Sequence, residues 1–134
     1  MNKCLFCRIV AGELPSERLY EDQQFVAILD IHPVNFGHLL IMPKTHEENF
    51  LSASPAVLTA IFPLAQNLAR ALMEATGTPG FNLLINNGRL SGQLIDHLHI
   101  HIVPRLETDG LKHWPGKTYA QGQMRPMGEK IRAN

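Results

Sequence analysis

The sequence predicts an α+β domain on a mostly antiparallel sheet of about five strands, with one long and one short helix. Short apolar runs typical of strands lie on both sides of a single long segment with helical periodicity, and the connections between them are short. With 134 residues, the chain also has the length of one domain that can bury a core without disulfides.

Three strands are expected before the long helix. Residues 18–21 could form a short strand, and residues 25–30 and 37–43 are apolar runs bounded by charged residues, Pro or Gly. The connection between these two runs, residues 31–36, suits a hairpin. Near the start of the chain, a short helix is expected over residues 8–11.

The long helix is expected over residues 55–76. Its apolar residues recur at helical spacing; they are Val57, Ile61, Leu64, Leu68 and Leu72. Ser54 is a good N-cap, Pro55 suits the first helical position, and Gly77 suits the residue after the helix. Pro63 removes a backbone donor inside this stretch, which predicts a kink or a later helix start.

Two further strands and a tail complete the chain. The apolar runs 81–87 and 97–103 predict the strands, with a Gly-containing turn region between them. Beyond Pro104 the composition changes, because Gly, Pro and Gln are scattered among mostly basic charges. We therefore expect a domain over residues 1–105 and a loosely structured carboxy-terminal tail over residues 106–134.

Charge and hydropathy exclude several classes of protein. Twelve Lys and Arg balance twelve Asp and Glu, so the chain lacks the basic excess of a protein that coats nucleic acid. No apolar run approaches the roughly 20 residues of a membrane span, and the first residues show no signal peptide. We expect a cytoplasmic protein with no nucleic-acid or membrane partner. Its only cysteines, Cys4 and Cys7, form a CxxC pair that suits metal ligation or redox exchange.

Residues 96–104 carry the main chemical signal. On a strand, His97, His99 and His101 would share one face and the apolar residues between them the other. The polar outer face of a half-buried strand would also give this pattern, but three imidazoles need many hydrogen-bond partners. Two functional interpretations compete: ligation of a metal that activates water, or nucleophilic attack on phosphorus by one neutral imidazole.

Segments that suit phosphate binding lie just before these histidines. Asn86-Asn87-Gly88 and Ser91-Gly92-Gln93 contain glycines that let backbone N–H groups approach an anion closely. The sequence has no GxxxxGK[ST] motif, which excludes a Walker-type NTPase. It also lacks the Asp/Glu cluster that usually holds Mg²⁺ against phosphates.

Four separated motifs resemble the histidine triad (HIT) family of nucleotide hydrolases and transferases. His97-Leu98-His99-Ile100-His101-Ile102-Val103 matches the His-φ-His-φ-His-φ-φ signature. The opening residues 4–15, the segment from Leu29 to His46, and Gly92-Gln93 with Pro104-Arg105 resemble other parts of the family pattern in the same order. The resemblance covers about residues 4–105.

The resemblance implies roles for the polar residues. His99 would attack the α-phosphorus of a nucleoside phosphoramidate or dinucleoside polyphosphate, forming a covalent nucleotidyl-His99 that water opens to release a nucleoside monophosphate. His101 would contact the phosphate, and His38 would position the triad. Gln93 and the Gly92 backbone would hold the phosphate and leaving group, and Asn86 would also bind the substrate.

The resemblance also implies a nucleoside site and a homodimer. Asp30 would accept the ribose hydroxyls. A purine base would lie in an apolar slot, although core packing would account for the same side chains; they are Phe6, Ile9, Ile28, Leu29 and Ile31. The family is usually a homodimer whose two sheets join.

CxxC members of the family bind a structural zinc, and the corresponding ligands here are Cys4, Cys7, His46 and His97. Two thiolates and two neutral imidazoles suit tetrahedral zinc. A redox pair and an inert pair are the alternatives for the two cysteines.

One departure from the family pattern concerns the leaving group. Family members commonly carry Ser or Thr after Gly-Gln, whereas this chain has Leu94. Leucine cannot donate a hydrogen bond, which predicts an altered leaving-group preference or weaker catalysis. The alternatives to a nucleotidyl hydrolase are a non-catalytic nucleotide-binding or adaptor protein of the same fold, and a zinc hydrolase.

Overall fold

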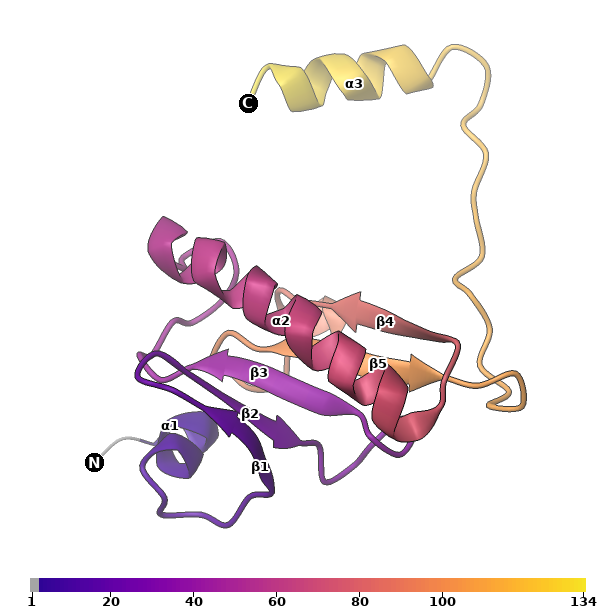
Figure 1. The fold of residues 1–134 in the computed structure, drawn as a ribbon. Helices are drawn as coiled ribbons and strands as arrows, with labels where there is room; N and C mark the ends of the chain where they lie inside the picture. The colour runs from indigo at the N-terminus through magenta and orange to yellow at the C-terminus, as the bar shows by residue number, and fades with distance from the viewer. Residues whose placement is uncertain (1–2) are drawn as a thin grey trace.

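The computed structural model describes residues 3–134 and contains a five-stranded antiparallel sheet with a helix on each face (Figure 1). In chain order the elements are α1 (Leu5–Val10), β1 (Arg18–Glu21), β2 (Phe25–Leu29), β3 (Leu39–Pro43), α2 (Pro55–Thr76), β4 (Gly80–Leu84), the short 3-10 helix η1 (Arg89–Ser91), β5 (Ile100–Arg105) and α3 (Met124–Arg132). The strand order is β1-β2-β3-β5-β4. The predicted α+β class is confirmed.

The long helix α2 begins and ends where the sequence predicts. The Ser54 hydroxyl accepts a hydrogen bond from the Val57 N–H at 3.3 Å, and Gly77 adopts a left-handed conformation with φ 66°. Pro63 lies inside the helix, so the later start considered as one alternative is wrong. The inner stripe packs on the sheet; its buried residues are Ile61, Ala65, Ala69 and Leu72.

α2 differs from the sequence expectation in one respect. Its 22 residues, with a mean hydropathy of 1.3 over the best window, are long and apolar enough to cross a membrane. The packing of its inner stripe against β3 and β5 accounts for part of this hydropathy. Part of the apolar surface lies on the outer side, where Phe62, Pro63 and Ala71 are exposed.

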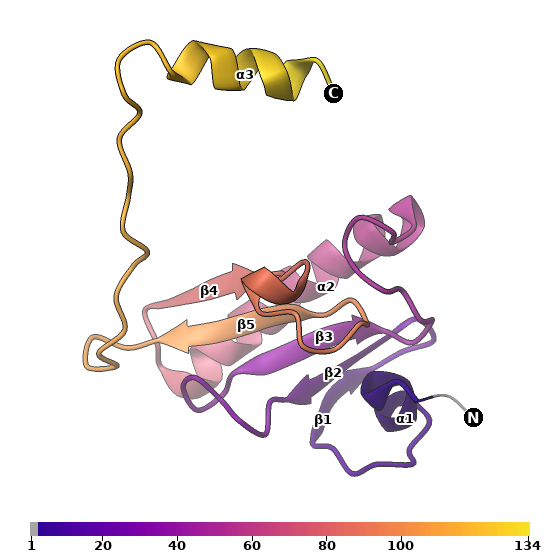
Figure 2. The same ribbon diagram turned by 180° about the vertical axis from the view of Figure 1, so that it is seen from behind.

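The sheet separates two apolar clusters. One cluster, beneath α2, contains Ile41 and Ile100, which are neighbours across β3 and β5. The other contains Leu40 and packs against Phe6 of α1 on the opposite face (Figure 2). His101 pairs with Leu40, so its imidazole lies on the α1 face of the sheet.

The last strand begins later than expected. β5 starts at Ile100, so His97 and His99 lie in the extended segment that precedes it. Ile100 and Ile102 are buried in the cluster beneath α2, whereas His97 and His99 are buried against Phe6 on the α1 face. The alternative of a polar outer face on a half-buried strand is therefore wrong.

Both ends of the chain contain more helix than expected. α1 begins at Leu5, three residues before the predicted short helix. The tail, predicted to be loosely structured, contains the nine-residue helix α3 after an extended segment that leaves the sheet (Figures 1 and 2). The domain boundary at residue 105 stays a prediction.

Candidate active site and metal centre

His99 is oriented by a main-chain carbonyl. Its Nδ1 lies 2.7 Å from the backbone oxygen of His97. Because a carbonyl oxygen only accepts hydrogen bonds, Nδ1 carries the proton and Nε2 keeps its lone pair. Burial lowers the pKa of His99, which favours the neutral ring. The geometry therefore supplies an imidazole whose free nitrogen is unprotonated.

A second chain of hydrogen bonds sets the tautomers of His38 and His101. The Val34 N–H donates to Nδ1 of His38 at 3.1 Å, so the His38 proton resides on Nε2. That nitrogen lies 2.9 Å from Nδ1 of His101, which must accept. The His101 proton is therefore on Nε2. Among the buried side-chain nitrogen and oxygen atoms of residues 3–134, this Nε2 is the one without a partner, so its N–H remains available to a ligand.

The imidazoles near Asp30 favour their neutral forms. Burial and the neighbouring His99 and His38 lower the pKa of His101 to about 4. Burial also lowers the pKa of His38, although the Asp30 carboxylate, 3.6 Å from its Nε2, opposes that shift. Asp30 itself accepts the N–H of His32 at 2.9 Å. The site thus presents neutral nitrogen donors and acceptors beside one carboxylate.

An apolar cavity of about 640 Å³ opens beside these groups. Asp30, His99, His101 and Gly92 lie at its polar part. All five side chains predicted for a base slot line it: Phe6, Ile9, Ile28, Leu29 and Ile31. The Phe6 ring meets the His99 ring edge-on, with centroids 4.9 Å apart.

Some residues that line the cavity were not predicted from the sequence. Leu14 and Pro15, from the loop before β1, and Ile95, before the histidines, also line it. Leu94 lies in the wall as well, with 74% of its surface exposed. Apolar residues in loops carry no periodic signal, which explains why the sequence did not identify them.

Gln93 has a different environment from the one expected. Its amide oxygen accepts the Gly88 N–H at 2.9 Å, and its amide nitrogen donates to the carbonyls of Glu48 at 2.8 Å and Ile95 at 3.2 Å. The side chain is buried and is not part of the cavity wall. Gln93 therefore joins three backbone segments, and its side chain does not face the substrate space.

Gly92 lies against Asn86 and carries the backbone at one part of the cavity wall. Gly92 has φ +101°, which disfavours any other residue, and an added Cβ would lie 3.3 Å from the Asn86 amide nitrogen. Gly92 lines the cavity, whereas Asn86 packs behind it. Of the residues predicted around the phosphate, the structure thus brings Gly92, His99 and His101 to the cavity.

Cys4, Cys7, His46 and His97 form a cluster with the arrangement of a metal site. Their ligand atoms all lie within 4.8 Å of one another. The Cys4 and Cys7 sulfurs lie 3.4 and 3.5 Å from Nδ1 of His97, and the Cys7 sulfur lies 3.4 Å from Nδ1 of His46. Tetrahedral zinc with ordinary bond lengths would separate sulfur and nitrogen ligands by about 3.5 Å.

The tautomer of His97 also fits a metal. Its Nε2 lies 2.8 Å from the Pro43 carbonyl and must donate to it, so Nδ1 directs a lone pair toward the two sulfurs. The residues present therefore fit zinc. They come from three separate segments: the start of α1, the loop after β3 and the segment before β5.

The fold and the site together define a small-molecule-binding α+β domain with histidine-based chemistry. Residues 11–108 match the HIT domain. The chain belongs to the HIT family, as its motifs predict.

Some curated relatives have names that state an activity, and two of them are described next. The chain is 46% identical over 110 residues to adenylylsulfatase HINT3 of Arabidopsis thaliana, a match that covers 82% of this chain and 56% of that protein. The chain thus spans little more than half of that relative's length. The chain is also 35% identical over 130 residues to adenosine 5'-monophosphoramidase hnt1 of Schizosaccharomyces pombe, a match that covers 96% of this chain and 95% of that protein.

Solved structures share the fold. SMU.412c of Streptococcus mutans has a TM-score of 0.93 and 36% identity, covering 99% of this chain and 85% of that one. A HIT-family protein of Bacillus subtilis has a TM-score of 0.90 and 34% identity, covering 98% and 96%. A Zn-bound histidine triad protein of Mycobacterium smegmatis has a TM-score of 0.78 and 36% identity, covering 98% and 91%.

Proposed function

We propose that the protein is a nucleotidyl hydrolase or transferase that acts at the α-phosphorus of nucleoside phosphoramidates or dinucleoside polyphosphates. The main support is the unprotonated Nε2 of His99, oriented by the His97 carbonyl beside an apolar cavity. The names of the two relatives, an adenylylsulfatase and an adenosine 5'-monophosphoramidase, also support nucleotide hydrolysis.

In the proposed reaction, Nε2 of His99 attacks the α-phosphorus while the bond to the leaving group breaks. The leaving group takes a proton from solvent. The ring, now bonded to phosphorus through Nε2, keeps its proton on Nδ1, which still donates to the His97 carbonyl. Water then attacks the phosphorus, breaks the P–N bond to His99 and releases the nucleoside monophosphate. That water releases a proton to solvent, which replaces the proton that the leaving group took up in the first step.

The neighbouring groups would bind the charged parts of the substrate. The free N–H of His101 would donate to a non-bridging phosphoryl oxygen, where negative charge is concentrated in the transition state. Gly92 would allow its backbone to approach the phosphate. Asp30 would accept the ribose hydroxyls, and the apolar wall formed by Phe6 and Ile9 would take a purine base.

We also propose a structural zinc held by Cys4, Cys7, His46 and His97. When bound, zinc would join the three segments that carry these ligands and have no direct part in the reaction. The His97 carbonyl orients His99, so the metal would stabilise the segment that positions the nucleophile.

A cytoplasmic homodimer is the proposed assembly, with no nucleic-acid or membrane partner. β4 is an edge strand with Phe81 and Leu83 partly exposed, and the outer side of α2 exposes Phe62. If a second copy of the chain packed against β4 and the outer side of α2, both apolar surfaces would be covered.

A non-catalytic nucleotide-binding or adaptor protein is the second candidate. This candidate is favoured by Gln93 and Leu94, the two residues expected beside the leaving group. The Gln93 amide is hydrogen-bonded to backbone groups, and the Leu94 side chain offers no hydrogen-bond donor.

Turnover of an adenosine phosphoramidate and a dinucleoside polyphosphate separates the two candidates. We expect hydrolysis of at least one of them, and an adenylylated protein in intact-mass spectra after rapid quenching. His99→Asn should lower turnover at least about 10³-fold while nucleotide binding persists. Tight binding without turnover in the parent protein would instead support the adaptor.

A further inference from the structure

One side chain ties down the loop that sets the tautomer of His38. This loop, residues 31–37, connects β2 to β3 and contains Val34, whose N–H donates to Nδ1 of His38. The Asn35 amide nitrogen donates to the Pro104 carbonyl at 2.7 Å and to Oδ2 of Asp109 at 3.2 Å. Within residues 3–134, these two bonds are the hydrogen bonds that join the loop to segments other than its own flanks.

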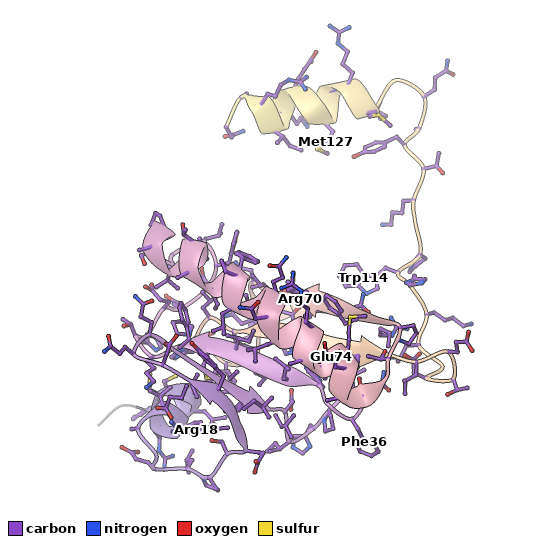
Figure 3. All side chains as sticks on the ribbon, in the orientation of Figure 1. Arg18, Phe36, Arg70, Glu74, Trp114 and Met127 are labelled. Atoms are coloured by element: carbon purple, nitrogen blue, oxygen red, sulfur yellow. The ribbon has the colours of Figure 1, made fainter. Side chains whose placement is uncertain are left out.

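Apolar packing does little to hold the loop near Val34. The Val34 side chain is 51% exposed and that of Phe36 is 91% exposed, and Phe36 points away from the domain in Figure 3. A cavity of about 620 Å³ is lined both by the loop and by the turn that follows β5. Gly37 packs closely on Leu72 of α2, but it lies at the other end of the loop. The position of the Val34 N–H therefore depends on the hydrogen bonds of Asn35.

Asp109 is held in place to accept the Asn35 amide. Its side chain is only 3% exposed, and it accepts Nε of Arg105 at 2.8 Å. The backbone N–H groups of Leu106 and Leu111 also donate to it, at 3.1 and 2.9 Å. The hydrogen bond from Arg105 is the main reason why the pKa of Asp109 lies well below its usual range. Asp109 is therefore a charged acceptor whose position is fixed by groups outside the loop.

The tautomer of His38 matters because the His38–His101 pair has two ways of sharing its protons. In the structure, Nε2 of His38 donates to Nδ1 of His101, and His101 carries its own proton outward on Nε2. If the Val34 N–H moved away, Nδ1 of His38 would be able to carry the proton. His101 would then donate inward through Nδ1, and its outer Nε2 would present a lone pair. A lone pair at that position repels a phosphoryl oxygen, whereas an N–H stabilises it.

We propose that Asn35 and Asp109 are positioning residues: they hold the Val34 N–H on His38 and thereby keep the N–H of His101 directed outward. Neither Asn35 nor Asp109 lines the substrate cavity, and Asp109 lies beyond the segment that matches the HIT domain. The effect on turnover rests on the proposed function, in which His101 donates to the phosphate. The effect on the tautomers does not rest on it.

Long-range 1H–15N NMR of the imidazole rings tests the proposal directly in the full chain, because the 15N shifts of Nδ1 and Nε2 report which nitrogen carries the proton. In the parent protein, we expect His38 and His101 to be protonated at Nε2. In Asn35→Ala, we expect a mixture of tautomers, with the two 15N shifts of each ring moving toward one another. Parent tautomers in Asn35→Ala would overturn the proposal.

Asn82→Ala is the matched control for Asn35→Ala. The Asn82 amide oxygen accepts Nη1 of Arg105 at 2.8 Å, so Asn82 is bonded to the arginine that holds Asp109 but does not reach the loop. It should keep the parent tautomers, and thermal unfolding of both variants shows whether they lose similar stability. A tautomer mixture in Asn82→Ala as large as that in Asn35→Ala would contradict a specific role for Asn35.

Asp109→Asn and Glu107→Gln form a second matched pair, because both remove one negative charge from the turn after β5. The Asp109→Asn amide places N–H groups where the carboxylate accepts from Asn35 and Arg105, so this variant should also show mixed tautomers. Glu107 is exposed, and Glu107→Gln should keep the parent pattern. Equal tautomers in the two variants would contradict a role for Asp109.

Steady-state turnover of an adenosine phosphoramidate measures the catalytic consequence. Asn35→Ala and Asp109→Asn should lower kcat at least about tenfold and change KM by less than about threefold, because the N–H of His101 acts on charge that grows in the transition state. Lowered kcat with parent tautomers would overturn the positioning role and leave the proposed function intact. Mixed tautomers in the variants of a protein whose parent form has no turnover would support the positioning role and refute the proposed function.

Discussion

The backbone N–H of Val34 lies 3.1 Å from Nδ1 of His38, and this hydrogen bond determines the tautomers of two imidazoles. Because His38 must then donate through Nε2 to His101, the outer nitrogen of His101 becomes a donor. The Val34 N–H, which contacts His38, thus determines that His101 presents an N–H donor to a phosphate.

Replacing His38 tests this relay. His38→Leu removes the donor to Nδ1 of His101 and should lower kcat/KM by at least about tenfold, whereas His38→Gln can still donate and should retain more activity. The measurement is steady-state turnover of an adenosine phosphoramidate, with thermal unfolding as the control for folding. Equal losses in the two variants would argue against a tautomeric role.

The pKa shift of His101 predicts a pH dependence of stability. His101 faces His99, His38 and the Asp30 carboxylate, and its pKa falls from 6.5 to about 4 on folding. Between these values the unfolded chain binds more protons, so the free energy of unfolding should fall as the pH decreases from about 6.5 to 4. His101 should contribute on the order of 2–3 kcal/mol to this loss.

Denaturant unfolding at several pH values, with His101→Gln for comparison, measures that contribution. The variant lacks the titrating ring and should lose less stability over the same interval. Parallel curves for the parent and the variant would show that His101 does not titrate as the structure predicts.

The proposed zinc should contribute to thermal stability. Removing it with a chelator, or replacing Cys4 with Ser, should lower the Tm by about 5 °C or more, because the three segments that carry the ligands would lose their link. His113→Ser, which changes an exposed tail imidazole, is the matched control. Metal content near zero in protein purified under reducing conditions without chelator would refute the site.

Leu94 should influence the choice of leaving group. Leu94→Ser places a hydroxyl in the cavity wall and should change the ratio of kcat/KM between an amine and a phosphate leaving group by about threefold or more. Stability should change by less than about 0.5 kcal/mol because the side chain is largely exposed. Leu90→Ser, the same substitution at an exposed position outside the cavity wall, should leave the ratio unchanged.

The sequence was most informative where side-chain type and spacing determine structure. Ser54 and Gly77 located the ends of α2, and the alternation around His99 placed the imidazoles on one side of the segment. The orienting groups were not predictable in the same way. The Val34 N–H and the Pro43 carbonyl belong to the main chain, and their approach to the rings depends on how distant segments pack.

The environment of Gln93 and the helix α3 were not predicted from the sequence, for different reasons. Gln93 was assigned to the substrate by resemblance, but the backbone groups of Gly88, Glu48 and Ile95 surround its amide. α3 has three apolar positions among scattered Gly and Pro, too few for a periodic signal.

Main-chain groups orient each of the buried rings: the Val34 N–H for His38, the His97 carbonyl for His99, and the Pro43 carbonyl for His97. Any residue other than proline supplies the same N–H, and every residue supplies the same carbonyl. The side chains of the cavity wall can therefore be exchanged while the rings keep their directions. This separation makes the domain a suitable scaffold for engineering, in which pocket shape can be diversified around a fixed nucleophile.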